Sequence, residues 1–253
     1  MKMHALSGGR LRLKKSLYFP DADRAETIDV PVSCFLLRHA QGNVLFDTGC
    51  HPSVVDDPEA RWGGVARVMR PVFAPADNLV NQIACIGLEP DDIDVVINSH
   101  FHSDHCGCNE FFKKATVFCH AAELAAVKAA DAERNGYVRA DWENPLPIHT
   151  IEGEHDLFGD SKIVLKPLPG HTPGTTGALV ELERSGAFLL ASDTVSMRVS
   201  FDREIIPRNT WNADALTRSL AEVRRIEADG ATVLCGHDEQ QWATLKKLGD
   251  AYD

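Results

Sequence analysis

The sequence His100-Phe101-His102-Ser103-Asp104-His105 places four potential metal ligands within six residues. It directly follows the apolar run at residues 93–97, which predicts a buried strand. Side chains two positions apart on an extended backbone point the same way, so His100 and His102 can face one cation. Asp104 and His105 follow where the chain turns towards its next element. This pattern favours a metal site over a polar loop that contains histidines by chance.

Three further residues, His171, Asp193 and His237, each follow another apolar run. These runs predict strands at residues 163–168, 188–191 and 232–235. The carboxyl ends of strands are where sites assemble in layered α/β sheets. Glycines beside His171 and His237 let the backbone turn tightly and approach closely. We therefore expect seven side chains, distant along the chain, to meet at one site.

Strands and helices alternate in both halves of the chain, which is typical of an α/β architecture. Further strands are predicted at residues 32–37, 44–46, 116–119 and 178–182. Helices are predicted at residues 79–86, 121–134 and 213–229, the last one capped by Asn212 and ended by Gly230. The cationic run 10–15 is interpreted as a solvated edge strand or arm. Residues 62–75 are interpreted as a loop or short helix over the sheet.

Bulk properties restrict the partners. The net charge is 26 − 37 = −11, so the chain should repel phosphate backbones and nucleic acid is not an expected partner. No stretch reaches the roughly 18 apolar residues that a membrane span needs. Residues 1–10 lack the apolar segment of a signal peptide, and seven cysteines are present. We expect a cytoplasmic protein with free thiols that act as small apolar filler.

These motifs together resemble the metallo-β-lactamase superfamily. Its H-x-H-x-D-H motif matches residues 100–105, and its later histidine, aspartate and histidine match His171, Asp193 and His237 in order. Asp47-Thr48-Gly49 matches the D-T-G turn that is common in the superfamily. The resemblance covers about residues 32–238. It implies an α/β fold, a four-layer αββα sandwich, formed by a single hydrolase domain over residues 1–253.

The resemblance also implies two divalent metal ions and the ligands of each. One ion is held by His100, His102 and His171, the other by Asp104, His105 and His237, and Asp193 bridges both. Imidazole and carboxylate ligands suit zinc, with iron, manganese or cobalt as possible substitutes. Seven ligands shared by two cations leave open coordination positions, which indicates a catalytic site. A metal-bridging hydroxide would be the nucleophile, and Asp104 would shuttle its proton to the leaving oxygen.

Within the superfamily, the chain resembles the N-acyl-homoserine lactonases and 4-pyridoxolactonase. The resemblance is carried by the compact length, by residues 94–102 and by the spacing to residues 169–171. It implies a lactonase that opens N-acyl-homoserine lactones or related lactones. Four aromatic residues are candidates for a substrate pocket, although core packing is the simpler interpretation of each: Trp62, Phe73, Phe201 and Trp211.

Several alternatives stay open. A phosphodiester, organophosphate or other ester hydrolase would use the same ligands, and a metal-binding protein without catalysis is a third hypothesis. Homoserine lactonases typically carry a tyrosine three residues after the bridging aspartate, where this chain has Ser196. The sequence points to none of the three tyrosines, Tyr18, Tyr137 and Tyr252, as a substitute. Residues 62–75 fit a homodimer contact as well as a pocket.

Overall fold

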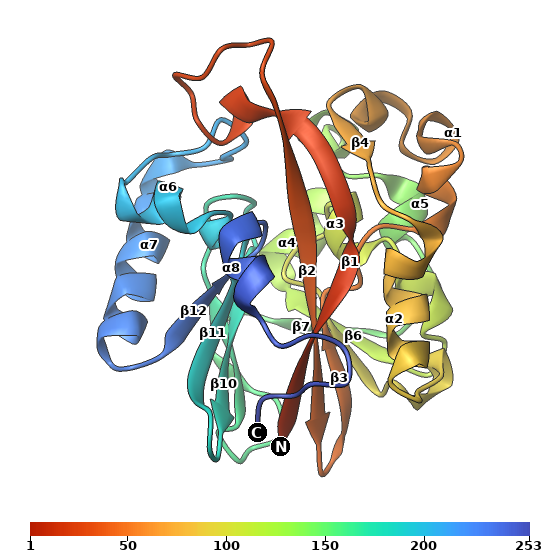
Figure 1. Cartoon of the computed structure of the whole chain (residues 1–253), viewed down its shortest axis with the longest axis vertical. Helices are drawn as coiled ribbons and strands as arrows, with labels where there is room; N and C mark the ends of the chain where they lie inside the picture. The colour runs from red at the N-terminus through yellow and green to blue at the C-terminus, as the bar shows by residue number, and fades with distance from the viewer.

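Two β-sheets pack face to face, and helices cover the outer side of each sheet (Figure 1). The computed structural model describes residues 1–253. From left to right in Figure 1, the layers are α7, the sheet that contains β10–β12, the sheet that contains β1–β3, and α2 with its neighbours. The predicted four-layer αββα sandwich is therefore confirmed.

The larger sheet has seven strands in the order β4-β1-β2-β3-β5-β6-β7. Its first strands pair antiparallel, whereas β3, β5, β6 and β7 run parallel. Parallel strands present their carboxyl ends at one edge, which is where His100 follows β5. The strands are β1 (Lys2–Lys14), β2 (Thr27–His39), β3 (Gly42–Phe46), β4 (Met69–Pro71), β5 (Val95–Ile97), β6 (Thr116–His120) and β7 (Ile148–Ile151).

The smaller sheet has five strands in the order β12-β11-β10-β9-β8. Only β11 and β12 pair in parallel, so their carboxyl ends lie side by side and deliver Asp193 and His237 to the same edge. His171 enters from the turn between β9 and β10. The strands are β8 (His155–Asp156), β9 (Ile163–Pro167), β10 (Thr176–Leu182), β11 (Gly186–Ser192) and β12 (Thr232–Cys235).

The helices are short apart from α7. They are α1 (Pro58–Trp62), α2 (Leu79–Cys85), α3 (Ser103–Cys106), α4 (Ala121–Val127), α5 (Arg139–Trp142), α6 (Arg198–Asp202), α7 (Ala213–Ala228) and α8 (Glu239–Thr244). Asn212 caps α7 by accepting from the backbone N–H of Ala215, and Gly230 follows its end with φ +108°, as predicted. None of these helices combines the length and apolar character needed to cross a membrane.

One core lies between the two sheets. Phe35 and Phe46 of the larger sheet meet Leu165, Val180 and Leu190 of the smaller one, and all five are buried. A second core packs the other face of the larger sheet against α2 and α4, and a third packs the smaller sheet against α7. Strands with buried side chains on both faces explain the continuous apolar runs of the sequence.

Two sequence interpretations need correction, and both concern segments that the tertiary structure uses. Residues 10–15 are not a solvated edge: β1 pairs with β2 on one side and β4 on the other, and Leu11 and Leu13 are buried. The predicted helix 121–134 ends at Val127, although alanine favours helix throughout. The chain turns after this point and forms a 3-10 helix at Ala132–Asn135, where Asn135 O accepts a hydrogen bond from His102 Nε2 at 3.1 Å. Helix continuation would carry Asn135 away from this contact.

Residues 62–75, interpreted as a loop or short helix, contain more structure than predicted. They contain the end of α1, a 3-10 helix at Gly63–Arg67 and the edge strand β4. Trp62 and Phe73 are buried with Leu11 and Val32 in a fourth core beneath this segment. The segment therefore covers one end of the larger sheet.

Candidate metal centre

Three histidines, His100, His102 and His171, form the first group of facing nitrogen atoms. His100 Nε2 lies 3.1 Å from His102 Nδ1, which lies 3.0 Å from His171 Nε2. The first two come from the turn after β5, and His171 comes from the other sheet. Their ring atoms lie close enough together to hold one metal ion.

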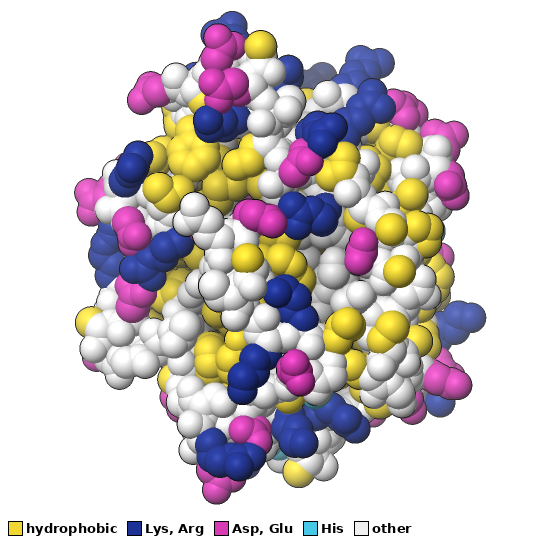
Figure 2. Space-filling view, viewed as in Figure 1, with side chains coloured by type: hydrophobic (Ala, Val, Ile, Leu, Met, Phe, Trp, Pro, Cys, Tyr) yellow, Lys and Arg dark blue, Asp and Glu magenta, His cyan; other side chains and the backbone are white.

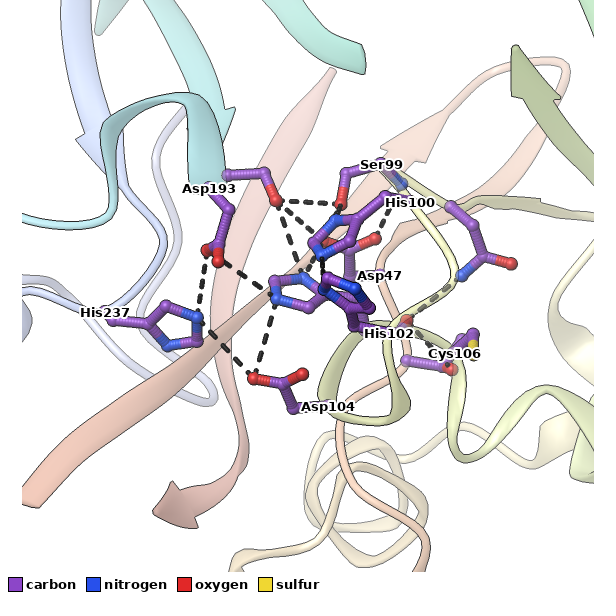
Figure 3. A network of polar contacts seen from close by, with 12 residues as sticks. Asp47, Ser99, His100, His102, Asp104, Cys106, Asp193 and His237 are labelled. Atoms are coloured by element: carbon purple, nitrogen blue, oxygen red, sulfur yellow. Dashed lines mark hydrogen bonds and ion pairs between the residues drawn. The ribbon is translucent and has the colours of Figure 1, made fainter. Parts of the chain in front are cut away.

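Asp104, His105 and His237 form a second group beside the first. Figure 3 shows Asp104 and His237 facing each other. Asp104 Oδ2 lies 3.7 Å from His105 Nε2 and 3.6 Å from His237 Nε2. Asp104 and His105 belong to α3, the single helical turn that follows His102, while His237 follows β12. Both groups therefore combine residues from both sheets.

Asp193 lies between the two groups and directs one carboxylate oxygen to each. Its Oδ2 lies 3.3 Å from His171 Nε2, and its Oδ1 lies 2.9 Å from His237 Nε2. Close packing makes this possible, since a Cβ on Gly236 would lie only 2.8 Å from Asp193 Oδ1. The structure thus brings together all seven residues that the sequence singled out, and we call these seven residues the candidate metal centre.

Hydrogen bonds on the outer side of the rings fix which nitrogen of each histidine faces inward. His105 Nδ1 donates to Asp47 Oδ2 at 2.8 Å, and His237 Nδ1 donates to Pro31 O at 2.8 Å. His102 Nε2 is held by Asn135 O in the same way. A ring nitrogen that donates to an acceptor carries the proton, which leaves the other nitrogen with a free lone pair. The inward-facing atoms are therefore arranged as metal ligands.

Asp47 and Ser99 continue this network behind the candidate metal centre. Asp47 accepts from Ser99 N at 2.8 Å and from Ser99 Oγ at 2.8 Å, and Ser99 Oγ also contacts His100 Nδ1 at 3.0 Å. Asp47 thus supports His105 directly and His100 through Ser99. The aspartate of the D-T-G turn is thus a hydrogen-bond acceptor behind the candidate metal centre.

Burial and charge produce an electrostatic field suited to cations. Burial alone would lower the pKa of His105, but Asp104, Asp47 and Asp193 outweigh it and raise that pKa to about 10. Burial lowers the pKa of His171 to about 4, although Asp193 opposes this. His105 Nε2 is buried and has no hydrogen-bond partner. Such an orphaned buried atom among carboxylates fits a divalent cation, which would satisfy the nitrogen and the negative charge together.

Glu123, which the sequence analysis missed, joins the two segments that carry the first group. It is fully buried in the first turn of α4 and has no cationic partner. Its carboxylate accepts from Phe101 N at 3.0 Å, from Thr172 Oγ1 at 2.7 Å and from Gly174 N at 3.0 Å. Phe101 separates His100 from His102, and Thr172 follows His171. A lone acidic residue just after a strand end, in an alanine-rich helix, was the available signal.

A cavity of about 690 Å³ opens onto the candidate metal centre. His102, Asp104, His171 and Asp193 line its base. The residues that we call its mouth are Lys14, Leu17, Val68, Arg208 and Trp211. Tyr18 and Tyr137 both line this cavity, a position that the sequence pattern did not indicate.

A second hollow, of about 720 Å³, lies next to α6 and reaches His237 from the other side. Phe19, Met197 and Val199 contribute apolar surface to it. Figure 2 shows hydrophobic side chains gathered near the β1–β2 connection and α6, with positive and negative charges interspersed elsewhere on this face. The second hollow touches only His237 of the candidate metal centre, so the first cavity is the route to that centre.

Of the four aromatic residues considered for a pocket, only Trp211 lines the cavity. Trp62, Phe73 and Phe201 are buried in the cores, as the simpler interpretation held. The seven thiols are free, and all but that of Cys85 are buried. Burial raises the pKa of Cys106 and of Cys108. These thiols stay protonated and pack beside the motif without joining the metal ligands.

Comparison with known proteins gives a consistent result. The model of the metallo-beta-lactamase superfamily matches residues 27–237. The N-acyl homoserine lactonase AttM of Agrobacterium fabrum is 30% identical, with 100% of this chain and 98% of that protein covered. The N-acyl homoserine lactonase AiiB of the same organism is 31% identical, with 89% of this chain and 86% of that protein covered.

Solved structures agree with this result. An N-acyl homoserine lactone hydrolase with the product N-hexanoyl-L-homoserine bound at its catalytic metal centre superposes with a TM-score of 0.89 at 26% identity, covering 99% of this chain and 98% of that one. The dizinc quorum-quenching lactonase AidC, at 18% identity and a TM-score of 0.70, covers 94% of this chain and 87% of that one and shares the fold.

Proposed function

The chain belongs to the metallo-beta-lactamase superfamily, and from this premise we propose that it is a metal-dependent lactonase. Its substrates are N-acyl homoserine lactones or related lactones, which it hydrolyses to hydroxy acids. Full-length relatives with this named activity and a solved neighbour with such a product bound support the assignment. One domain over residues 1–253 carries the activity, because ligands from both sheets complete one site.

The convergence of seven inward-facing ligands carries the proposal. His100, His102 and His171 would hold one divalent cation, Asp104, His105 and His237 the other, and Asp193 would bridge them. We propose zinc as the native metal, since imidazole nitrogen and carboxylate oxygen suit it. When bound, the two metal ions would supply Lewis acidity and lower the pKa of a water molecule towards neutrality. The six buried free thiols support a reducing compartment, which we propose is the cytoplasm.

The residues of the chain then place and move protons. Hydrolysis forms a bond from the water oxygen to the lactone carbonyl carbon and breaks the ring C–O bond. One water proton must reach the departing ring oxygen. Asp104 lines the cavity and lies at its base beside His237, with 7% of its surface exposed. We assign the transfer to this carboxylate, which accepts the proton from water and returns it to the ring oxygen.

The experiment combines metal analysis with a substrate panel. Purified protein is loaded with zinc, its metal content is measured, and it is assayed on N-acyl homoserine lactones, simple lactones, aryl esters and aryl phosphodiesters. We expect about two metal ions per chain and preferential ring opening of lactones. Phosphodiester cleavage without lactone opening would instead assign the site to phosphoryl transfer. Metal binding without turnover of any compound would contradict enzymatic function.

A further inference from the structure

Attack of water oxygen on the lactone carbonyl carbon develops negative charge on the carbonyl oxygen, and a hydrogen-bond donor aimed at that oxygen accelerates the reaction. The hydroxyl of Ser196 does not meet this need. Ser196 is buried, does not line the cavity, and its Oγ has no hydrogen-bond partner. Thr172, which does line the cavity, already donates to Glu123 at 2.7 Å. Neither of these two hydroxyls is therefore placed to act as that donor.

Tyr18 lies where such a donor is required. It follows β1 in the connection to β2, and its ring centroid lies 6.2 Å from that of His237. It lines the same cavity as Asp104 and Asp193, although only 2% of its surface is exposed. Its backbone N–H donates to Lys15 O at 3.1 Å, whereas its hydroxyl makes no hydrogen bond to another protein group. A buried hydroxyl group left free beside a reaction site is available to a substrate.

Tyr137, the other tyrosine of the cavity, is arranged differently. Its ring packs 5.1 Å from the ring of His102, but its hydroxyl is enclosed by the protein and faces Glu123. It therefore supports the turn after α4 and does not face the substrate space. Of the two phenols, only that of Tyr18 is open to the cavity.

The segment that carries Tyr18 is held in place from the opposite side of the cavity. Arg208 N donates to Leu17 O at 2.7 Å, and Arg208 Nη2 donates to Pro20 O at 2.8 Å. These contacts fix the carbonyl groups on both sides of Tyr18. Three residues on, Trp211 N donates to His171 O at 3.1 Å, which ties the same loop to the candidate metal centre. A donor held in this way loses little freedom when the reaction occurs.

We propose that Tyr18 is a catalytic residue that donates a hydrogen bond to the lactone carbonyl oxygen as its negative charge develops. The phenol keeps its proton throughout. A phenol has an ordinary pKa of about 10, and burial raises the pKa of Tyr18 further, so it remains a donor at neutral pH. This inference rests on the proposed lactonase function and adds a residue outside the metal-ligating segments.

The test compares Tyr18→Phe with Ser196→Ala and with Tyr252→Phe, the matched control. Tyr252→Phe also removes a phenol oxygen, but near the C-terminus, where that hydroxyl accepts only from Lys246 N. Phenylalanine keeps the ring that Tyr18 contributes to the core, so melting temperature and metal content should stay close to wild type. We expect Tyr18→Phe to lower kcat on an N-acyl homoserine lactone by roughly 100-fold with KM within threefold. Both other variants should stay within threefold.

A second measurement separates this inference from the proposed function. Calorimetry measures binding of a cyclic phosphonate, whose tetrahedral anionic group mimics the charged state, to the zinc-loaded proteins. Tyr18→Phe should weaken this binding roughly 10-fold, and Tyr252→Phe should not change it. Unchanged kcat and unchanged phosphonate affinity in Tyr18→Phe overturn the inference, as does an equal loss in Ser196→Ala. Wild-type protein that binds phosphonate through Tyr18 yet opens no lactone overturns only the proposed function.

Discussion

The candidate metal centre and the mouth of its cavity are built in opposite ways. The seven residues of the centre lie at or shortly after strand ends, all but His102 are buried, and hydrogen bonds such as that from His105 to Asp47 hold them from behind. The mouth consists of connections between elements, and its apolar residues Val68 and Trp211 are 65% and 55% exposed. Rigid sheets fix the reaction geometry, while loops on the same scaffold are free to determine which molecule enters.

This contrast predicts that substitutions at the centre remove catalysis, whereas substitutions at the mouth mainly change substrate affinity. The largest loss is expected for Asp193→Asn. An amide cannot offer two anionic oxygens to the two ligand groups, so the stabilisation lost should be several kcal/mol, or on the order of 1,000-fold in kcat. Metal analysis should find fewer than two ions per chain, while circular dichroism stays native.

Asp202→Asn is the matched control for that substitution, because Asp202 is exposed on α6 and pairs only with Arg198 at 2.8 Å. Its activity should equal that of wild type. Full turnover in Asp193→Asn would remove the basis for a bridging carboxylate and, with it, the distinction between centre and mouth.

Glu123→Gln should have the next largest effect, because Glu123 orients ligands without contacting metal or substrate. Glutamine matches the size of glutamate, but its NH₂ group would face one of the three donors that the carboxylate now accepts from. Loss of such support typically costs 10–100-fold in metal affinity. Competition with a zinc chelator should show one of the two ions bound more weakly, the one assigned to His100, His102 and His171.

Glu152→Gln, on the surface, is the control for Glu123→Gln and should leave both affinities unchanged. Equal weakening of both ions in Glu123→Gln would show that Glu123 stabilises the fold as a whole. It would not then be a positioning residue for one ligand group.

The same contrast explains what the sequence could predict. The centre could be predicted because four candidate ligands lie within one hexapeptide and the other three each follow an apolar run. Strands that are buried on both faces are apolar over continuous runs. The layers, and the convergence of the strand ends, could therefore be predicted from the sequence. Asp47, next to the end of β3, was readable for the same reason.

The mouth could not be predicted from the sequence, because its contacts join backbone carbonyls to distant side chains and leave no local sequence pattern. Nothing in residues 15–20 indicates that Arg208 binds Leu17 O and Pro20 O almost two hundred positions away. The predicted helix 121–134 was wrong beyond Val127, where the chain instead turns and brings Asn135 O to His102, because tertiary contacts can outweigh helix propensity. Long-range backbone contacts of this kind require the fold to be known.

Arg208→Ala tests how strongly the mouth depends on those contacts. The backbone N–H that binds Leu17 O remains, and only the bond from Nη2 to Pro20 O is lost. One hydrogen bond is worth about 1 kcal/mol, so kcat/KM should fall roughly fivefold, with unchanged metal content. Arg218→Ala, on the exposed face of α7, should have no effect. A loss as large as that of Asp193→Asn would mean that the mouth takes part in catalysis as fully as the centre.

Trp211→Ala should have the smallest effect and the most selective one. The indole is half exposed at the mouth, and the backbone N–H that holds it to His171 O is retained in alanine. A lactone with a long acyl chain would lose roughly 20 Å² of apolar contact, or about 0.5 kcal/mol, which raises its KM about twofold.

A short-chain lactone does not reach the mouth and serves as the internal control in the same assay. A series of increasing chain length should therefore diverge between wild type and variant only beyond the length that reaches Trp211. Equal changes at every length would indicate that the loop moved, and would place Trp211 among the residues that support His171.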